Sequence, residues 1–241
     1  MQYSIVIPAH NEAANLREFV NDFMAALAEF PKSVLTEVVI VENGSTDSTL
    51  AECKKLETDF PNLVRTFSLS RGSYGAAVKH GIEQCRGTHV SILECDFLDT
   101  EFIAESIRLF DESDSRFIVA SKRHPNSSDR RPIKRRALTW AFNSILRFVV
   151  GYPGSDTHGL KSIDAPLARQ LCELALTTDE TFQTEIVILA WRLGYEIKEL
   201  PISITERRRA PISVRQRLPK VVSMLSELRR SAARIPRSPG R

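Results

Sequence analysis

The stretch Val90-Ser91-Ile92-Leu93-Glu94-Cys95-Asp96-Phe97-Leu98-Asp99 passes abruptly from apolar to acidic residues. Its first half is mostly apolar and contains β-branched side chains, which predicts a buried strand that ends where the carboxylates begin. Because residues i and i+2 of a strand point to the same side, we expect Glu94 and Asp96 to project together from the strand end. Mg²⁺ commonly takes one or two protein carboxylates together with substrate phosphates, so one interpretation is a metal-assisted nucleotide site. The other is an acidic turn in which Asp99 or Thr100 caps a following helix.

Similar strands alternate with helices along the first half of the chain. Strands are expected at residues 4–8, 37–41, 63–67 and 117–121, and helices are expected up to about residue 28, from an N-cap at Ser45 to about residue 57, and from the Gly72 turn through residue 84. This alternation predicts an α/β fold with right-handed crossovers and a mostly parallel central sheet that has helices on both faces. Ligands of such sheets bind outside the carboxyl ends of the strands.

The second half of the chain is more basic. A polar loop is expected at residues 122–131, helices at residues 133–150 and 181–193, an edge strand at residues 196–204 interrupted by Pro201, and a basic helix from about residue 212 to residue 234. We expect a main domain over residues 1–215, followed by the basic C-terminal helix and a disordered tail over residues 216–241.

Charge is unevenly distributed, although the formal net charge of the 241 residues is only +3. Residues 122–147 and 207–241 are both rich in Lys and Arg, and each tract contains a single acidic residue. Such tracts favour phosphate-bearing partners. Neither tract has a recognised nucleic-acid reader motif, so no nucleic-acid partner is expected.

Several observations concern the cellular compartment. The four cysteines form no CxxC or zinc-site spacing, which is typical of reduced thiols in a cytosolic protein. A strand is predicted to begin at Tyr3, which leaves no room for a signal peptide, and no apolar run is long enough to span a bilayer. We therefore expect a cytoplasmic protein that contacts the inner face of an anionic membrane through residues 134–136 and the C-terminal helix.

The glycine-containing turn Gly72-Ser73-Tyr74-Gly75 is followed by no Gly-Lys-Ser/Thr and is not a GxGxxG sequence. ATPase and Rossmann dinucleotide sites therefore lack their fingerprints.

Taken together, the motifs resemble glycosyltransferase family 2, with a nucleotide-diphospho-sugar domain of the GT-A type. The first half carries this resemblance in Pro8-Ala9-His10-Asn11-Glu12, Glu42-Asn43-Gly44-Ser45-Thr46-Asp47, Arg71-Gly72-Ser73-Tyr74-Gly75 and Glu94-Cys95-Asp96. The second half is similar to the branch that includes dolichol-phosphate mannose synthase and bacterial polyprenyl-phosphate glycosyltransferases, in residues 131–143, Asp156-Thr157-His158-Gly159-Leu160-Lys161, Phe182-Gln183-Thr184-Glu185 and residues 199–202.

This sequence also departs from the family pattern. Glu42-Asn43 stands where the family has paired Asp residues, Glu94 stands for the first Asp of an Asp-x-Asp motif, and Leu98 stands where many relatives have a metal-supporting Gln. The late loop has Pro211 and Val214 in place of Gly and Lys.

The resemblance implies a role for each matching residue. A divalent cation, Mg²⁺ or Mn²⁺, would be held by Glu94 and Asp96. Nucleotide binding would fall to Pro8, His10, Glu12, Glu42, Asn43, Arg71, Gly75 and Glu94. Acceptor phosphate binding would fall to Arg123, Arg135, Arg208 and Ser213, and the catalytic residues would be Asp96, Arg135 and Asp156.

The activity implied is inverting transfer of a sugar from a GDP- or UDP-sugar to a polyprenyl phosphate, dolichyl or undecaprenyl. A phosphate nucleophile is already anionic and needs cations rather than a general base. A hydroxyl acceptor on a polysaccharide or glycolipid would need a carboxylate base, for which Asp156 and Glu185 are the choices. A non-catalytic nucleotide-sugar-binding module is the other alternative. A homodimer and a membrane-protein partner both remain open.

Overall fold

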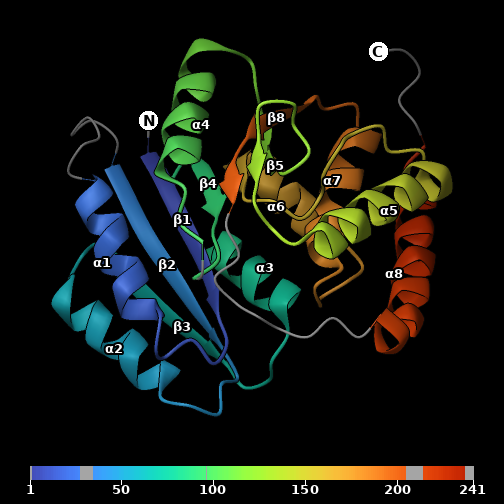
Figure 1. Ribbon diagram of the computed structural model, residues 1–241. Coiled ribbons are helices and arrows are strands. Elements are labelled where there is room, and N and C mark those ends of the chain that lie inside the picture. Colours follow the sequence, from blue (N-terminus) through green and yellow to red (C-terminus); the bar gives the residue numbers. More distant parts are fainter. Residues whose placement is uncertain (1, 28–34, 96, 205–213, 237–241) are drawn as a thin grey trace.

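The computed structural model describes residues 2–27, 35–95, 97–204 and 214–236. Within these ranges, seven strands form one sheet in the order β3-β2-β1-β4-β7-β5-β8 (Figure 1). The strands are β1 (Gln2–Ala9), β2 (Leu35–Asn43), β3 (Val64–Leu69), β4 (His89–Ile92), β5 (Phe117–Ser121), β7 (Lys161–Asp164) and β8 (Ile197–Pro201). Strand β7 runs antiparallel to both of its neighbours, and the other pairs are parallel.

Helices cover both faces of this sheet, as the alternating pattern predicts. They are α1 (Leu16–Leu27), α2 (Thr49–Asp59), α3 (Tyr74–Gln84), α4 (Thr100–Glu112), α5 (Ile133–Val150), α6 (Ala165–Leu174), α7 (Phe182–Arg192) and α8 (Val214–Arg234). Side chains of β1 alternate between two hydrophobic clusters: Ile5 and Ile7 pack with α1, α2 and α4, whereas Val6 packs with α3, α6 and α7. The expected mostly parallel α/β architecture is therefore confirmed.

The strand that carries the acidic stretch is shorter than its apolar sequence suggests. β4 ends at Ile92, and Glu94 lies beyond it in an isolated antiparallel bridge with Phe97. The Asp99 side chain accepts a hydrogen bond of 2.9 Å from the backbone N–H of Phe102 and caps α4, so the capping interpretation holds for this residue. Asp96 lies outside the described residues.

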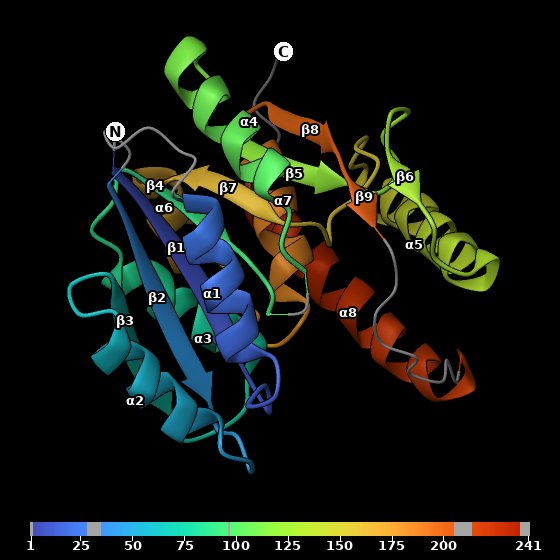
Figure 2. The same ribbon diagram turned by 60° about the vertical axis from the view of Figure 1, so that its left-hand side comes forward.

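Other local expectations need correction. Ser45 is not an N-cap, because α2 begins at Thr49; the Ser45 hydroxyl instead accepts a hydrogen bond of 3.0 Å from the backbone N–H of Asn11. The polar segment 122–131 was expected to be a loop. It contains β6 (Ser128–Asp129), which pairs with β9 (Ser203–Ile204) in a small parallel sheet beside α5 (Figure 2).

Two elements lie between the predicted ones and carry weak local signals. Strand β7 is only four residues long and begins with the charged Lys161, yet it lies inside the sheet, between β4 and β5. Helix α6 follows it directly, capped by the Asp164 side chain, which accepts a 3.0 Å hydrogen bond from Leu167 N–H.

The C-terminal helix α8 packs on α7 and α5, with Leu228 and Ala232 buried in the same cluster as the sheet residues. The predicted domain division at residue 215 stays a prediction. Of the expected disordered tail, residues 237–241 lie outside the described residues, and Ile235 packs against the core. None of the helices in the described ranges combines the length with the apolar composition of a membrane-spanning segment.

Candidate functional site

The carboxyl ends of β1 and β2 meet the loop before α3, and hydrogen bonds between side chains and backbone hold the three segments together. His10 Nδ1 lies 2.7 Å from the carbonyl oxygen of Asn43 and donates to it. The Asn43 side-chain oxygen accepts a 2.7 Å hydrogen bond from the N–H of Ser73. Gly44 adopts φ +63°, and a Cβ there would lie 2.6 Å from the nitrogen of Gly72. Gly44 is therefore required for this close approach, whereas a Cβ at Gly72 would make only an ordinary contact of 3.4 Å with the Asn43 carbonyl oxygen.

The Glu42 carboxylate is a buried acceptor beneath these loops. It receives hydrogen bonds from the Ser45 N–H at 2.5 Å and from the Ser68 hydroxyl at 2.6 Å. Burial by itself would raise the pKa of Glu42, but the hydrogen bonds from Ser68 and Ser45 outweigh it and lower that pKa. The ionised Glu42 carboxylate thus holds the loop in place by accepting hydrogen bonds from Ser45 and Ser68.

The other predicted nucleotide-binding residues surround this loop cluster. Pro8 is half-buried in β1, and Arg71 is exposed in the loop before α3. The backbone N–H of Glu12 donates to the Thr49 hydroxyl at 2.9 Å. Gly75 is buried where α3 meets the segment before α7, since a Cβ there would lie 2.6 Å from Phe182 Cβ.

Glu94 is held from a distant part of the chain. Gln183, in the first turn of α7, donates from Nε2 to Glu94 Oε1 over 2.9 Å. Sequence reasoning found Gln183 only as part of a motif and assigned it no role. An amide from α7 therefore orients the Glu94 carboxylate.

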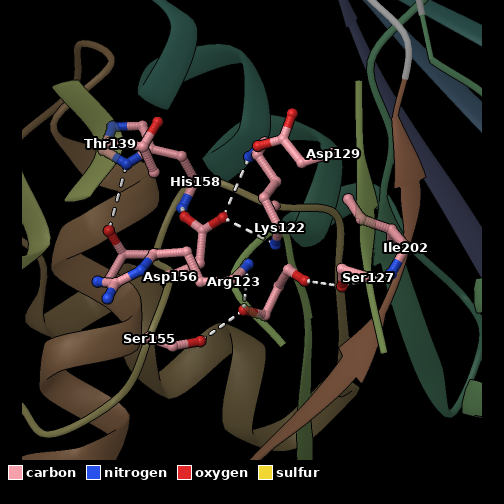
Figure 3. Close-up of polar contacts among 12 residues, drawn as sticks. Lys122, Arg123, Ser127, Asp129, Thr139, Ser155, Asp156, His158 and Ile202 are labelled. Atoms are coloured by element: carbon pink, nitrogen blue, oxygen red, sulfur yellow. Dashed lines mark hydrogen bonds and ion pairs between the residues drawn. The ribbon is translucent and has the colours of Figure 1, made fainter. Parts of the chain in front are cut away.

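Asp156 is a fully buried carboxylate in the segment between α5 and β7, beside Lys122 at the end of β5 (Figure 3). Its Oδ2 accepts from the backbone N–H of Lys122 at 3.2 Å and from Lys122 Nζ at 3.3 Å, and its Oδ1 accepts from the N–H of His158 at 3.0 Å. Burial would raise the pKa of Asp156, but the Lys122 ammonium and the two backbone donors prevail and lower it to about 2.

Burial favours the neutral forms of two titratable neighbours of Asp156, which are His158 and Lys161. Burial lowers the pKa of His158 to about 4, although Asp156 pulls it upward, and the ring packs edge-on against Phe142 at 5.1 Å between centroids. Burial likewise lowers the pKa of Lys161 to about 7, against the opposing pull of Glu94. The Lys161 ammonium donates to the Gly159 carbonyl at 2.8 Å.

A cavity of about 660 Å³ opens beside Lys122, between the β5–β6 loop and α5. Among the described residues its lining has four cations and one carboxylate, together with three apolar side chains: Lys122, Arg123, Arg131 and Arg136, then Asp129, then Ile133, Ala137 and Trp140. Arg131 is paired with Asp129 at 2.7 Å, and Lys122 with Asp156. Arg123 and Arg136 are exposed. The cavity is therefore both cationic and partly apolar.

A family model described as glycosyl transferase family 2 matches residues 4–161 of this chain, well over half of it. The chain belongs to glycosyltransferase family 2. It is 25% identical to a dolichyl-phosphate beta-glucosyltransferase of Trichomonas vaginalis, over 84% of this chain and 65% of that protein. It is 28% identical to a dolichyl-phosphate beta-glucosyltransferase of Saccharomyces cerevisiae, over 83% and 66%. The chain thus spans just under two thirds of the length of these curated relatives.

Solved structures share the fold of this family-2 chain. A glucosyl-3-phosphoglycerate synthase of Mycobacterium tuberculosis, in complex with Mn²⁺, UDP-glucose and phosphoglyceric acid, superimposes with a TM-score of 0.71 at 19% identity, over 98% of this chain and 81% of that chain. TarS of S. aureus matches with a TM-score of 0.56 at 20% identity, over 83% and 58%. At this identity the likeness concerns the fold alone, and it confirms the GT-A architecture expected from the sequence.

The residues of this family-2 chain that were predicted to bind the acceptor phosphate differ in their position relative to the cavity. Arg123 lines the cavity, whereas Arg135 does not; its neighbour Arg136 does. Arg208 and Ser213 lie outside the described residues. Sequence reasoning did not single out Lys122, Arg136 or Trp140 as site residues, although the basic tract that contains them was the available signal.

Proposed function

We propose that this chain transfers a sugar, with inversion, from a nucleotide-diphospho-sugar to a polyprenyl phosphate. The observation that carries the proposal is the cationic, partly apolar cavity beside Asp156. The dolichyl-phosphate relatives support the same acceptor class.

The cavity suits a lipid phosphate better than a free sugar. An anionic phosphate oxygen that attacks the anomeric carbon needs cations to hold it, and Arg guanidinium groups match phosphate oxygens in pairs. Arg123 and Arg136 are the exposed Arg side chains of the lining. Ile133 and Trp140 would meet the first isoprene units of the acceptor.

A hydroxyl acceptor would need a general base, and neither of the two candidate carboxylates, Asp156 and Glu185, is placed to serve as one. Both oxygens of Asp156 accept hydrogen bonds, and its pKa of about 2 makes it a weak proton acceptor. Glu185 is fully buried. Its Oε1 accepts from the Leu176 N–H at 2.7 Å and the Ser231 hydroxyl at 2.6 Å, and its Oε2 from the Thr177 N–H at 2.9 Å and the Thr177 hydroxyl. Glu185 therefore acts as a structural acceptor.

The donor would lie across the ends of β1, β2 and β4. Glu94 and Asp96 are the residues that would hold Mg²⁺ or Mn²⁺, and the described part of this set fits, because Gln183 occupies one oxygen of Glu94 and leaves the other available. The cation would neutralise charge on the departing nucleoside diphosphate. His10 and Asn43 would shape the nucleotide pocket, and the fold would orient the sugar toward the cavity.

The metal set can be tested with Asp96→Asn. This change should abolish transfer while leaving the thermal midpoint within a few degrees, because a ligand at a strand end contributes little packing. Mn²⁺ binding, followed by electron paramagnetic resonance with the nucleotide present, should weaken in parallel. Full turnover by the variant would remove Asp96 from the mechanism.

The acceptor assignment calls for a panel of nucleotide-sugars offered with polyprenyl phosphate, with and without Mn²⁺. Arg123→Ala should reduce transfer about tenfold to a hundredfold, because charge-assisted hydrogen bonds to the phosphate are lost, and should leave nucleotide-sugar affinity unchanged. Arg136→Ala should reduce the transfer rate more than Arg135→Ala does, because Arg136 lines the cavity and Arg135 does not.

Arg130→Ala is the matched control, because Arg130 is exposed in the same tract but absent from the lining. If Arg123→Ala and Arg130→Ala reduced transfer equally, the assignment of the cavity as the acceptor site would be wrong. Tight nucleotide-sugar binding with no transfer to any acceptor would identify a non-catalytic binding module.

A further inference from the structure

The outer face of α5 exposes large apolar side chains. Phe148 is 93% exposed, Ile133 80% and Trp140 60%, and Leu138 and Ile145 are also exposed. Helical spacing places Ile133, Trp140 and Phe148 along one stripe, while Leu146 and Val150 on the opposite side are buried in the core. Single exposed apolar residues are ordinary, but a continuous apolar stripe on one helix marks an interaction surface.

The charges around this stripe have one sign. Helix α5 contains Lys134, Arg135, Arg136 and Arg147 and no carboxylate. The basic helix α8 lies on the same end of the molecule, opposite α1 and α2, in both views (Figures 1 and 2). The surface is therefore complementary to an apolar layer bounded by negative charge.

The stripe runs into the mouth of the cavity, because Ile133 and Trp140 belong to both. We propose that the outer face of α5 inserts into the headgroup–acyl boundary of an anionic bilayer, with Trp140 and Phe148 as its apolar anchors. The inference rests on the proposed function in one respect: insertion at this position brings the cationic cavity to the depth at which a lipid phosphate lies.

A bilayer fits these features better than a protein partner does. An interfacial helix combines an apolar face with Lys and Arg and places Trp at the boundary, as α5 does. The basic residues 134–136 and α8 predict an electrostatic contact, which salt would screen. The exposed stripe adds an apolar contribution that salt does not remove.

Trp140 provides a direct probe of this contact. The chain has two tryptophans, Trp140 and Trp191, so Trp191→Phe leaves Trp140 as the sole indole. With vesicles of phosphatidylcholine and phosphatidylglycerol, we expect its fluorescence to shift to the blue and to be quenched by lipids brominated near the top of the acyl chain. An unshifted, unquenched spectrum on bound protein would overturn the insertion.

Phe148→Ser removes the most exposed anchor without touching the cavity lining. It should lower the vesicle partition coefficient about tenfold to a hundredfold, and the loss should persist at high salt. Leu50→Ser, an exposed apolar side chain on α2 at the opposite end, is the control and should bind vesicles as the wild type does. Equal binding by wild type and Phe148→Ser would contradict the proposal.

Two further outcomes separate this inference from its alternatives. If the wild type were a dimer, Phe148→Ser a monomer, and neither protein bound vesicles, the outer face of α5 would be assigned to contact with a second copy of this chain. Transfer to a short-chain, water-soluble prenyl phosphate without vesicles should be unaffected by Phe148→Ser. Absence of that transfer in the wild type, with vesicle binding intact, would overturn the proposed function and leave the membrane surface standing.

Discussion

At the scale of single residues, the environment of His158 predicts how stability depends on pH. Folding lowers its pKa from 6.5 to about 4, so the neutral ring stabilises the fold above pH 6.5 and that contribution is lost as the pH falls toward 4. The shift corresponds to about 3 kcal/mol. Urea unfolding of wild type should weaken over this range, and His158→Gln should flatten the dependence. An unchanged slope in the variant would assign the acid sensitivity to other groups.

Lys161 is the second residue whose burial has a measurable cost. Its pKa falls from 10.5 to about 7, so the buried ammonium opposes folding fully below pH 7, and the penalty disappears as the pH rises to 10.5. Lys161→Met should therefore raise the free energy of unfolding at neutral pH by about 1–4 kcal/mol, and the gain should vanish near pH 10.5. A destabilised variant at pH 7 would show that the charge is held more favourably than its burial suggests.

At the scale of elements, the contact between α3 and the segment before α7 joins the loop that precedes α3 to the start of α7, where Gln183 lies. A Cβ at Gly75 would lie 2.6 Å from Phe182 Cβ and 2.7 Å from the carbonyl carbon of Thr178, and backbone cannot move aside cheaply. Gly75→Ala should cost about 1–3 kcal/mol of stability and weaken nucleotide-sugar binding.

Gly72→Ala is the matched control in the same loop, because its Cβ would meet nothing closer than 3.4 Å. Calorimetric unfolding and titration of the nucleotide-sugar measure both effects. Similar behaviour of the two variants would mean that the loop adjusts without loss.

At the scale of the whole molecule, the packing of α8 decides whether the chain unfolds as one unit. Leu228 is fully buried in the hydrophobic cluster that it shares with side chains of the central sheet, and the Ser231 hydroxyl donates a hydrogen bond to the buried Glu185 carboxylate. Leu228→Ala should lower the free energy of unfolding by about 2–5 kcal/mol, as deletions in a packed core do. Val222→Ala, exposed on the same helix, should change little. Loss of helical circular dichroism from α8 before the rest of the chain unfolds would instead support the predicted division at residue 215.

The sequence by itself determined the elements whose residues repeat with a clear period. Strand β5 and helix α5 begin and end where their apolar patterns do, and β1 and β2 are followed by polar residues at their carboxyl ends, as expected. Hydrophobic period and turn chemistry are local properties, so a short window of sequence is sufficient to read them.

Only the tertiary structure decided which distant groups meet. Gln183 reaches Glu94 across 89 positions of sequence, and β7 enters the sheet between β4 and β5 with almost no apolar pattern of its own. The basic tract likewise predicted phosphate binding, but its folding around β6 selected Arg136 rather than Arg135 for the cavity. Such choices depend on the direction in which each side chain leaves its element and on the packing of neighbours remote in sequence. No local pattern contains that information.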